Sequence, residues 1–272
     1  MTNLDNYLGR PQFITGLGDI YPLKVLEYQD FEYLGYKYLK YSKTGLVNLR
    51  KMQPDQTVYN YLIDTALEDS EFILNNVDKI DFSNPTIILE SFFIEEIITL
   101  LNLTTKKQFT FDEERREFVH LGENGEIENV LNEENFDAFQ QVVCNQNLIF
   151  EPLTSPDIRG QEHIETMYRV MSKKNPPSDL EAMISYLSVV MGIVDASVIE
   201  NFTYYRLRAD FESAVRNNQS FLVAMCISQG AKADPIDFSQ PLSLHENPHE
   251  GLMTRATITD ADKALLEAQG KM

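Results

Sequence analysis

Apolar residues recur every three or four positions along most of the chain, which is the spacing of an amphipathic helix. After residue 26 this spacing predicts one helix, whose inward stripe is formed by Tyr28, Phe31, Leu34, Tyr38 and Tyr41. Gly45 is the expected end of that helix. A second helix is expected over residues 57–76, with an inward face of Tyr61, Leu62, Ala66, Phe72 and Ile73. The pattern therefore predicts a mainly helical chain.

Start signals delimit the helices that follow. Ser83-Asn84-Pro85 is typical of a helix start, because Ser and Asn accept a backbone hydrogen bond and Pro tolerates the first turn. The segment that it opens, residues 86–103, is apolar on most faces and is expected at the centre of a core or under a partner. Asn132 is the candidate cap of a further helix, which directs inward Phe136, Phe139, Val143 and Cys144.

The last part of the chain carries three more helical patterns. One covers residues 161–173, and the next opens at a capping box formed by Ser178 and Glu181. Thr203 caps the third, and Gly230 ends it. Its expected inward stripe is Tyr204, Leu207, Phe211, Ala214 and Val215, continuing through Phe221 and Leu222 to Cys226.

Two short segments alternate apolar and polar residues and are predicted to be β-structure. Residues 12–25 form a hairpin around Gly16-Leu17-Gly18-Asp19. Residues 107–131 form a three-stranded meander, in which Asn124-Gly125 suits a tight turn because both residues tolerate positive φ. The fold class predicted is mainly α, a helical bundle with small antiparallel hairpin and meander elements.

Prolines mark the expected domain limits. The loop with Pro152 and Pro156 is the predicted boundary between an N-terminal helical domain, residues 1–150, and a C-terminal helical domain, residues 151–230. Residues 231–272 are expected to be an extended tail with a short terminal helix.

Charge and cysteine content narrow the class of protein. The formal charge of −19 disfavours general binding to nucleic acids and anionic membranes. Cys144 and Cys226 are predicted to be buried free thiols, as in proteins of a reducing cytoplasm. The longest apolar runs are too short to span a bilayer, so no membrane is expected as a partner.

Catalytic patterns are weak. In "HENPHE", His245 and His249 lie beside glutamates, but Pro248 between them favours a solvated loop over a metal site. The glycines near residue 17 lack the rest of a phosphate loop, and adjacent glutamates are typical of a solvated surface. We therefore predict no catalytic, cofactor-binding or metal-binding residue, no cofactor, and no enzymatic activity.

Aromatic residues carry more information, since the chain has 13 Tyr and 16 Phe. Tyr33, Tyr36, Tyr38 and Tyr41 are more rings than one buried helix face holds. Two interpretations stay open: the tyrosines surround the core with their hydroxyls in water, or they form a protein interface, where Tyr is favoured.

Three segments resemble the tail assembly chaperones, or tape-measure chaperones, of tailed phages that infect Gram-positive bacteria. They are "YLGRPQFITGLGDIYPLKVLEYQDF", "ENFDAFQQVVCNQNLIFEP", and "DLEAMISYLSVVMGI" with "IENFTYYRLRADF". The resemblance implies a non-enzymatic factor in the host-cell cytoplasm, whose partners are the tape-measure protein and the tail-tube protein.

For such a factor, the candidate protein-binding residues are Tyr204, Tyr205 and Phe211, which would anchor against neighbouring helices or a client, Arg208 at the polar rim, and Tyr33 and Tyr36. Homo-oligomerisation is compatible with the same surface. The alternatives are a structural tail or neck subunit of the virion, and an acidic inhibitor that mimics nucleic acid.

Overall fold

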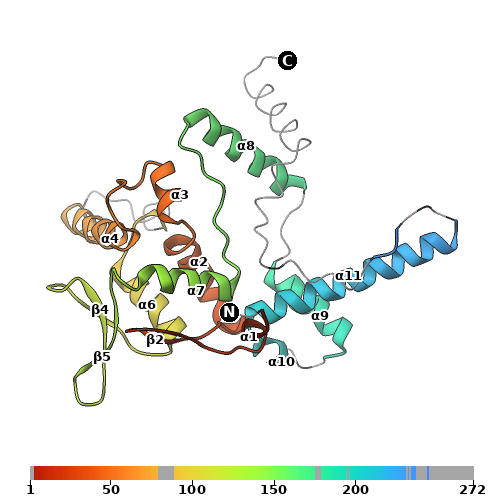
Figure 1. The fold of residues 1–272 in the computed structure, drawn as a ribbon, viewed down its shortest axis with the longest axis horizontal. Helices are drawn as coiled ribbons and strands as arrows, with labels where there is room; N and C mark the ends of the chain where they lie inside the picture. Colours follow the sequence, from red (N-terminus) through yellow and green to blue (C-terminus); the bar gives the residue numbers. More distant parts are fainter. Residues whose placement is uncertain are drawn as a thin grey trace.

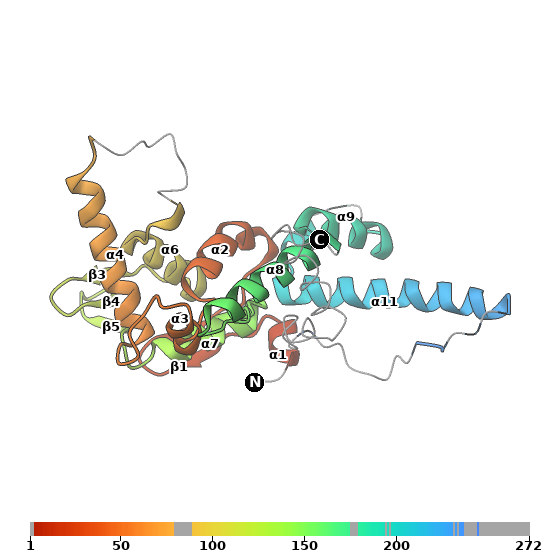
Figure 2. The ribbon, with the colours of Figure 1, turned by 90° about the horizontal axis from the view of Figure 1, so that it is seen from above.

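The computed structural model describes residues 3–78, 89–174, 179–193 and 197–230, together with residues 195, 232, 234–236 and 244. Within them lie ten helices and two small antiparallel sheets, so the predicted fold class is confirmed. Figures 1 and 2 both show the last helix, α11 (Tyr204–Ser228), projecting away from the rest of the molecule.

The predicted N-terminal hairpin is present. After the short helix α1 (Asn3–Tyr7), strand β1 (Gln12–Ile14) pairs with β2 (Gly18–Ile20). The turn between them is fully buried at Leu17, and the amide of Val130 donates to the carbonyl of Gly16 (2.8 Å). The hairpin is therefore held by a strand of the second sheet.

The helix after residue 26 carries the predicted stripe, but it ends earlier than expected. Helix α2 (Val25–Tyr38) buries Tyr28, Phe31, Leu34 and Tyr38. Tyr41 lies beyond the helix, and Gly45 lies inside α3 (Lys43–Asn48). The prediction that the helix ends at Gly45 is therefore wrong. The Ser42 hydroxyl accepts from the amide of Gly45, which starts a new helix where the sequence signal suggested a stop.

The helix predicted over residues 57–76 is α4 (Val58–Asn75), which is capped by Thr57 and buries Leu62 and Ala66. Phe72, expected to face inward, is exposed because the last turns of α4 extend beyond the residues that cover its start.

The single helix predicted over residues 86–103 is interrupted. Within the described part of that run, α6 (Ile94–Thr105) begins only after an extended Phe93. The amide of Phe92 donates to the Asp69 carboxylate (2.8 Å), and that of Phe93 donates to the Tyr38 hydroxyl (2.9 Å). These side-chain acceptors replace helical carbonyls, so the helix restarts. The predicted start at Ser83-Asn84-Pro85 lies outside the described residues.

The meander is confirmed. Its strands run antiparallel in chain order: β3 (Thr110–Asp112), β4 (Glu117–Leu121) and β5 (Ile127–Leu131). Gly125 has a positive φ (75°) but Asn124 does not, so residues 122–126 form a longer connection than the tight turn predicted. Helix α7 (Phe136–Asn147) then begins at Asn135 instead of Asn132, whose side chain accepts from the amide of Glu134 in the preceding turn.

Four helices complete the described chain: α8 (Ile158–Lys174), α9 (Leu180–Met191), α10 (Ser197–Glu200) and α11. The cap of α9 is Asp179, which accepts from the amide of Ala182 (2.6 Å), and not Ser178. Thr203 caps α11 as predicted, and Gly230 follows its end with positive φ.

Two hydrophobic clusters form the core. The larger draws its buried residues from positions 14–149, and the smaller from α9, α10, the start of α11 and Val25 of α2. The backbone joins them: Val25 donates to the carbonyl of Phe202 and Tyr204 donates to that of Leu23, both at 2.9 Å. The domain boundary at residue 150 stays a prediction.

The cysteines differ from the expectation. Cys144 is half-buried and its Sγ donates to the carbonyl of Leu39 (3.4 Å), whereas Cys226 is exposed near the end of α11. The predicted extended tail, its terminal helix and the histidines of "HENPHE" lie outside the described residues apart from a few isolated positions. No helix in the described part of the chain has the length and apolarity needed to cross a bilayer.

Candidate functional site

The first turns of α11 pack against other elements of the same chain. The ring of Tyr204 stacks on that of Tyr28 in α2, with centroids 3.5 Å apart and planes 6° from parallel. Tyr205 is 3% exposed, so its side chain is not available on the surface that the sequence suggested. The aromatic pair that opens α11 serves as an internal joint between α11 and the N-terminal helices.

The other two predicted residues of this helix contact α9 and their own turn. Phe211 packs edge-on against Tyr186, with centroids 5.5 Å apart. The guanidinium of Arg208 donates to Glu212 (3.1 Å) and lies 3.5 Å from the sulfur of Met183. Both side chains are partly buried: Phe211 is anchored against the neighbouring helix α9, and Arg208 is paired with an acidic group of its own helix.

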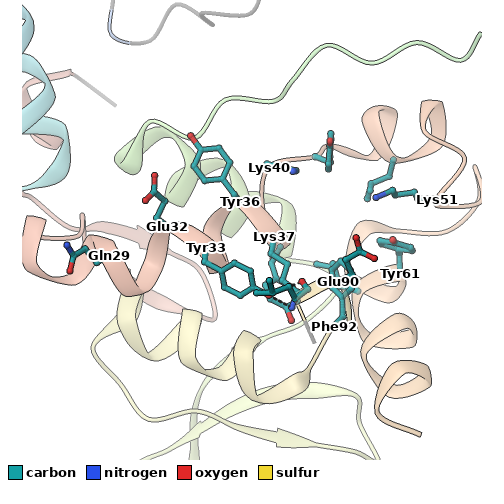
Figure 3. A pocket seen from close by; sticks show the side chains of 15 residues that line it. Gln29, Glu32, Tyr33, Tyr36, Lys37, Lys40, Lys51, Tyr61, Glu90 and Phe92 are labelled. Carbon is teal, nitrogen blue, oxygen red and sulfur yellow. Dashed lines mark hydrogen bonds between the residues drawn. The ribbon is translucent and has the colours of Figure 1, made fainter. Parts of the chain in front are cut away.

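Tyr33 and Tyr36 have a different setting. Each is 39% exposed, and both line an open pocket of about 930 Å³ (Figure 3). We call it the tyrosine pocket, because its aromatic walls are Tyr33, Tyr36, Tyr38, Tyr41, Tyr61 and Phe92. It lies between α2, the segment through α3, the start of α4 and residues 89–92.

One wall of the pocket is fixed by a neutralised lysine. The Lys37 ammonium donates to Glu96 (2.6 Å) and to the Tyr33 hydroxyl (2.8 Å), and its side chain is almost fully buried. The Tyr38 hydroxyl also donates to Glu96, and burial followed by this hydrogen bond raises the pKa of Tyr38. Lys37 therefore has its counter-ion within the protein.

Tyr36 connects the pocket with the start of α11. Burial raises the pKa of Tyr36, the neighbouring Tyr204 and Glu32 add to the increase, and the positive charge of Arg208 opposes it. Among the predicted residues, Tyr204 and Arg208 therefore act electrostatically on Tyr36. Tyr33 lies in the same pocket, and its hydroxyl donates to the carbonyl of Leu89 (2.9 Å).

Two further lysines, Lys40 and Lys51, line the pocket without a counter-ion among the described residues. Burial lowers the pKa of Lys40, and the positive charge of Lys51 lowers it further. Neither lysine forms an ion pair with another described residue. Glu32 and Glu90 line the same pocket (Figure 3), but neither carboxylate is bonded to these ammonium groups.

The far end of α11 is the second candidate site. From residue 217 to residue 230 there is no Asp, Glu, Lys or Arg. Phe221 (68%), Leu222 (61%), Met225 and Ile227 are exposed, on a helix end that projects into solvent in both ribbon views. The prediction that this stripe runs inward to Cys226 is wrong, because α11 continues past its contacts with α9. We call residues 217–230 the distal segment.

Sequence reasoning missed Lys40 and Lys51, although a signal was present. Between Glu32 and Asp55 there is no acidic residue, and the basic ones are Lys37, Lys40, Lys43, Arg50 and Lys51. A basic stretch in a chain of charge −19 is a local exception that indicates an electrostatic role.

Within the described residues no group of three or more His, Cys, Asp or Glu side chains is arranged to hold a metal ion. No family model matches the chain, and neither the curated proteins nor the solved structures give a match.

Proposed function

We propose that the protein is a non-enzymatic assembly factor of the tail assembly chaperone kind. It acts in the host-cell cytoplasm, binds an apolar helical segment of the tape-measure protein, and recruits the tail-tube protein. The observation that carries the proposal is the distal segment, an uncharged run whose large apolar side chains project into solvent. Exposed apolar surface of this kind is typical of sites that bind another polypeptide.

The chemistry of the distal segment suits a helical client. Successive exposed apolar residues on a helix pack against the apolar stripe of a second helix by side-chain interdigitation. The absence of charge in residues 217–230 removes the cost of desolvating ions at that contact. The acidic remainder of the chain keeps the complex dispersed, because its charge of −19 repels other copies.

The test is co-expression with a tape-measure protein. The wild-type chain is expected to keep that client in the soluble fraction and to co-purify with it. The double variant Phe221→Gln with Leu222→Gln is expected to lose both effects while keeping its circular dichroism spectrum, since both side chains are exposed.

A matched control exists on α4, where Phe72 and Leu74 are 60% and 75% exposed. Phe72→Gln with Leu74→Gln removes a similar apolar area and should leave client binding unchanged. A client that stays insoluble with the wild-type chain, or that binds the distal double variant normally, contradicts the proposal. Retention of the protein in mature particles, measured by mass spectrometry, would instead support a structural subunit.

A further inference from the structure

We propose that the tyrosine pocket is a binding site for a small organic anion, a carboxylate or phosphate group carried on a flat apolar body. The proposal does not depend on the assembly function, because the pocket and the distal segment are separate parts of the surface. It rests on the charge of the pocket, on its walls and on its volume.

The charge comes from Lys40 and Lys51. Both line the pocket, neither is paired with a described carboxylate, and Lys40 is half-buried. An anion between the two lysines would offset their mutual repulsion and the lost hydration of Lys40. Lys37 does not contribute, since Glu96 already neutralises it.

The aromatic walls of the pocket determine which apolar group the anionic ligand can carry. Aromatic faces favour a flat apolar group by stacking and edge contacts. Among the described residues, no partner accepts from the hydroxyls of Tyr36 and Tyr41, which leaves them as donors toward an anionic oxygen. A volume of about 930 Å³ lies within the range of small-molecule sites.

The acidic groups of the pocket and of the whole chain disfavour a ligand with many negative charges. Glu32 and Glu90 line the same pocket, and the whole chain carries −19. A polyanion such as a nucleic acid would meet this repulsion over its length, whereas a single carboxylate or phosphate meets mainly the two lysines. The ligand class is therefore a small aromatic anion.

The experiment titrates the full chain with benzoate and with phenyl phosphate. The chain has no Trp and five of its 13 Tyr line the pocket, so tyrosine fluorescence responds to binding there, and calorimetry measures the affinity. We expect saturable binding of at least one probe, with a dissociation constant below about 1 mM. Lys40→Gln and Lys51→Gln should each weaken that binding by about tenfold, as expected for a lost charge-assisted hydrogen bond.

The matched control is Lys43→Gln, which removes an exposed lysine of the same basic stretch that does not line the pocket. It should leave the affinity unchanged. The proposal is overturned if neither probe binds, if benzyl alcohol or inorganic phosphate binds as tightly as the aromatic anions, or if Lys43→Gln weakens binding as much as the pocket variants. Because Lys51 is exposed, its variant is expected to fold normally.

Discussion

The two ends of α11 have similar composition in large apolar residues and opposite surroundings. At the start, Leu207 is fully buried and Tyr204 is stacked on α2, whereas at the end Phe221 and Leu222 lie in solvent. One continuous helix therefore changes from a core element to an exposed element along its length. Whether an apolar side chain packs in the core or is exposed for binding depends on the elements around it, and residue type alone does not decide it.

The sharpest test of this difference uses one residue type at two positions. Leu207→Ala should lower the free energy of unfolding by about 2–5 kcal/mol, because it leaves a cavity in the smaller core. Leu222→Ala, at an exposed position of the same helix, should change it by less than about 0.5 kcal/mol. Urea denaturation measures both values. Equal losses would mean that the distal segment is packed in solution.

The cysteines give a second matched pair. Burial raises the pKa of the Cys144 thiol to about 12, so little thiolate is present at pH 8. Since the thiolate is the reactive species, iodoacetamide should label Cys144 at least about a hundredfold more slowly than the exposed Cys226.

The sign of the pH effect follows from the same shift. Because the folded protein holds the thiol proton more tightly than the unfolded chain, the neutral thiol contributes to the free energy of unfolding below pH 9. That contribution is lost as the pH rises toward about 12. The labelling rate of Cys144 should therefore keep increasing over that range. Mass spectrometry of the labelled peptides separates the two sites, and similar rates at pH 8 would contradict the burial of Cys144.

A smaller effect concerns the cap of α11. Thr203→Ala removes the acceptor for the amide of Arg206 (3.1 Å) and should cost about 1 kcal/mol of stability. Thr203→Ser keeps the hydroxyl and serves as the control. If the two variants unfold at the same urea concentration, the cap does not hold the buried end of the helix.

Local signals predicted the elements whose determinants lie close together in the chain. The stripe of Tyr28, Phe31, Leu34 and Tyr38, the cap Thr203 and the positive φ of Gly125 were all predicted. The interruption before Ile94 could not be predicted, because Asp69 and Tyr38, which accept its backbone donors, are distant in sequence.

The candidate sites show the same limit. Tyr33 and Tyr36 were identified by an excess of rings on one face, and both line the tyrosine pocket. Tyr204 and Tyr205 were expected to anchor against neighbouring helices or a client, and only the tertiary contacts reveal that α2 and neighbouring elements cover them. The exposure of Phe221 depends on where its neighbour α9 ends, which periodicity does not encode.

The paired backbone between residues 23–25 and 202–204 has a consequence for any attempt to divide the protein. Severing the polypeptide at residue 150 would give two pieces with matching edges: one would bear an unpaired amide at Val25, the other an unpaired amide at Tyr204. Those edges, flanked by the bare faces of Tyr28 and Tyr204, favour reassociation of the fragments into the parent arrangement.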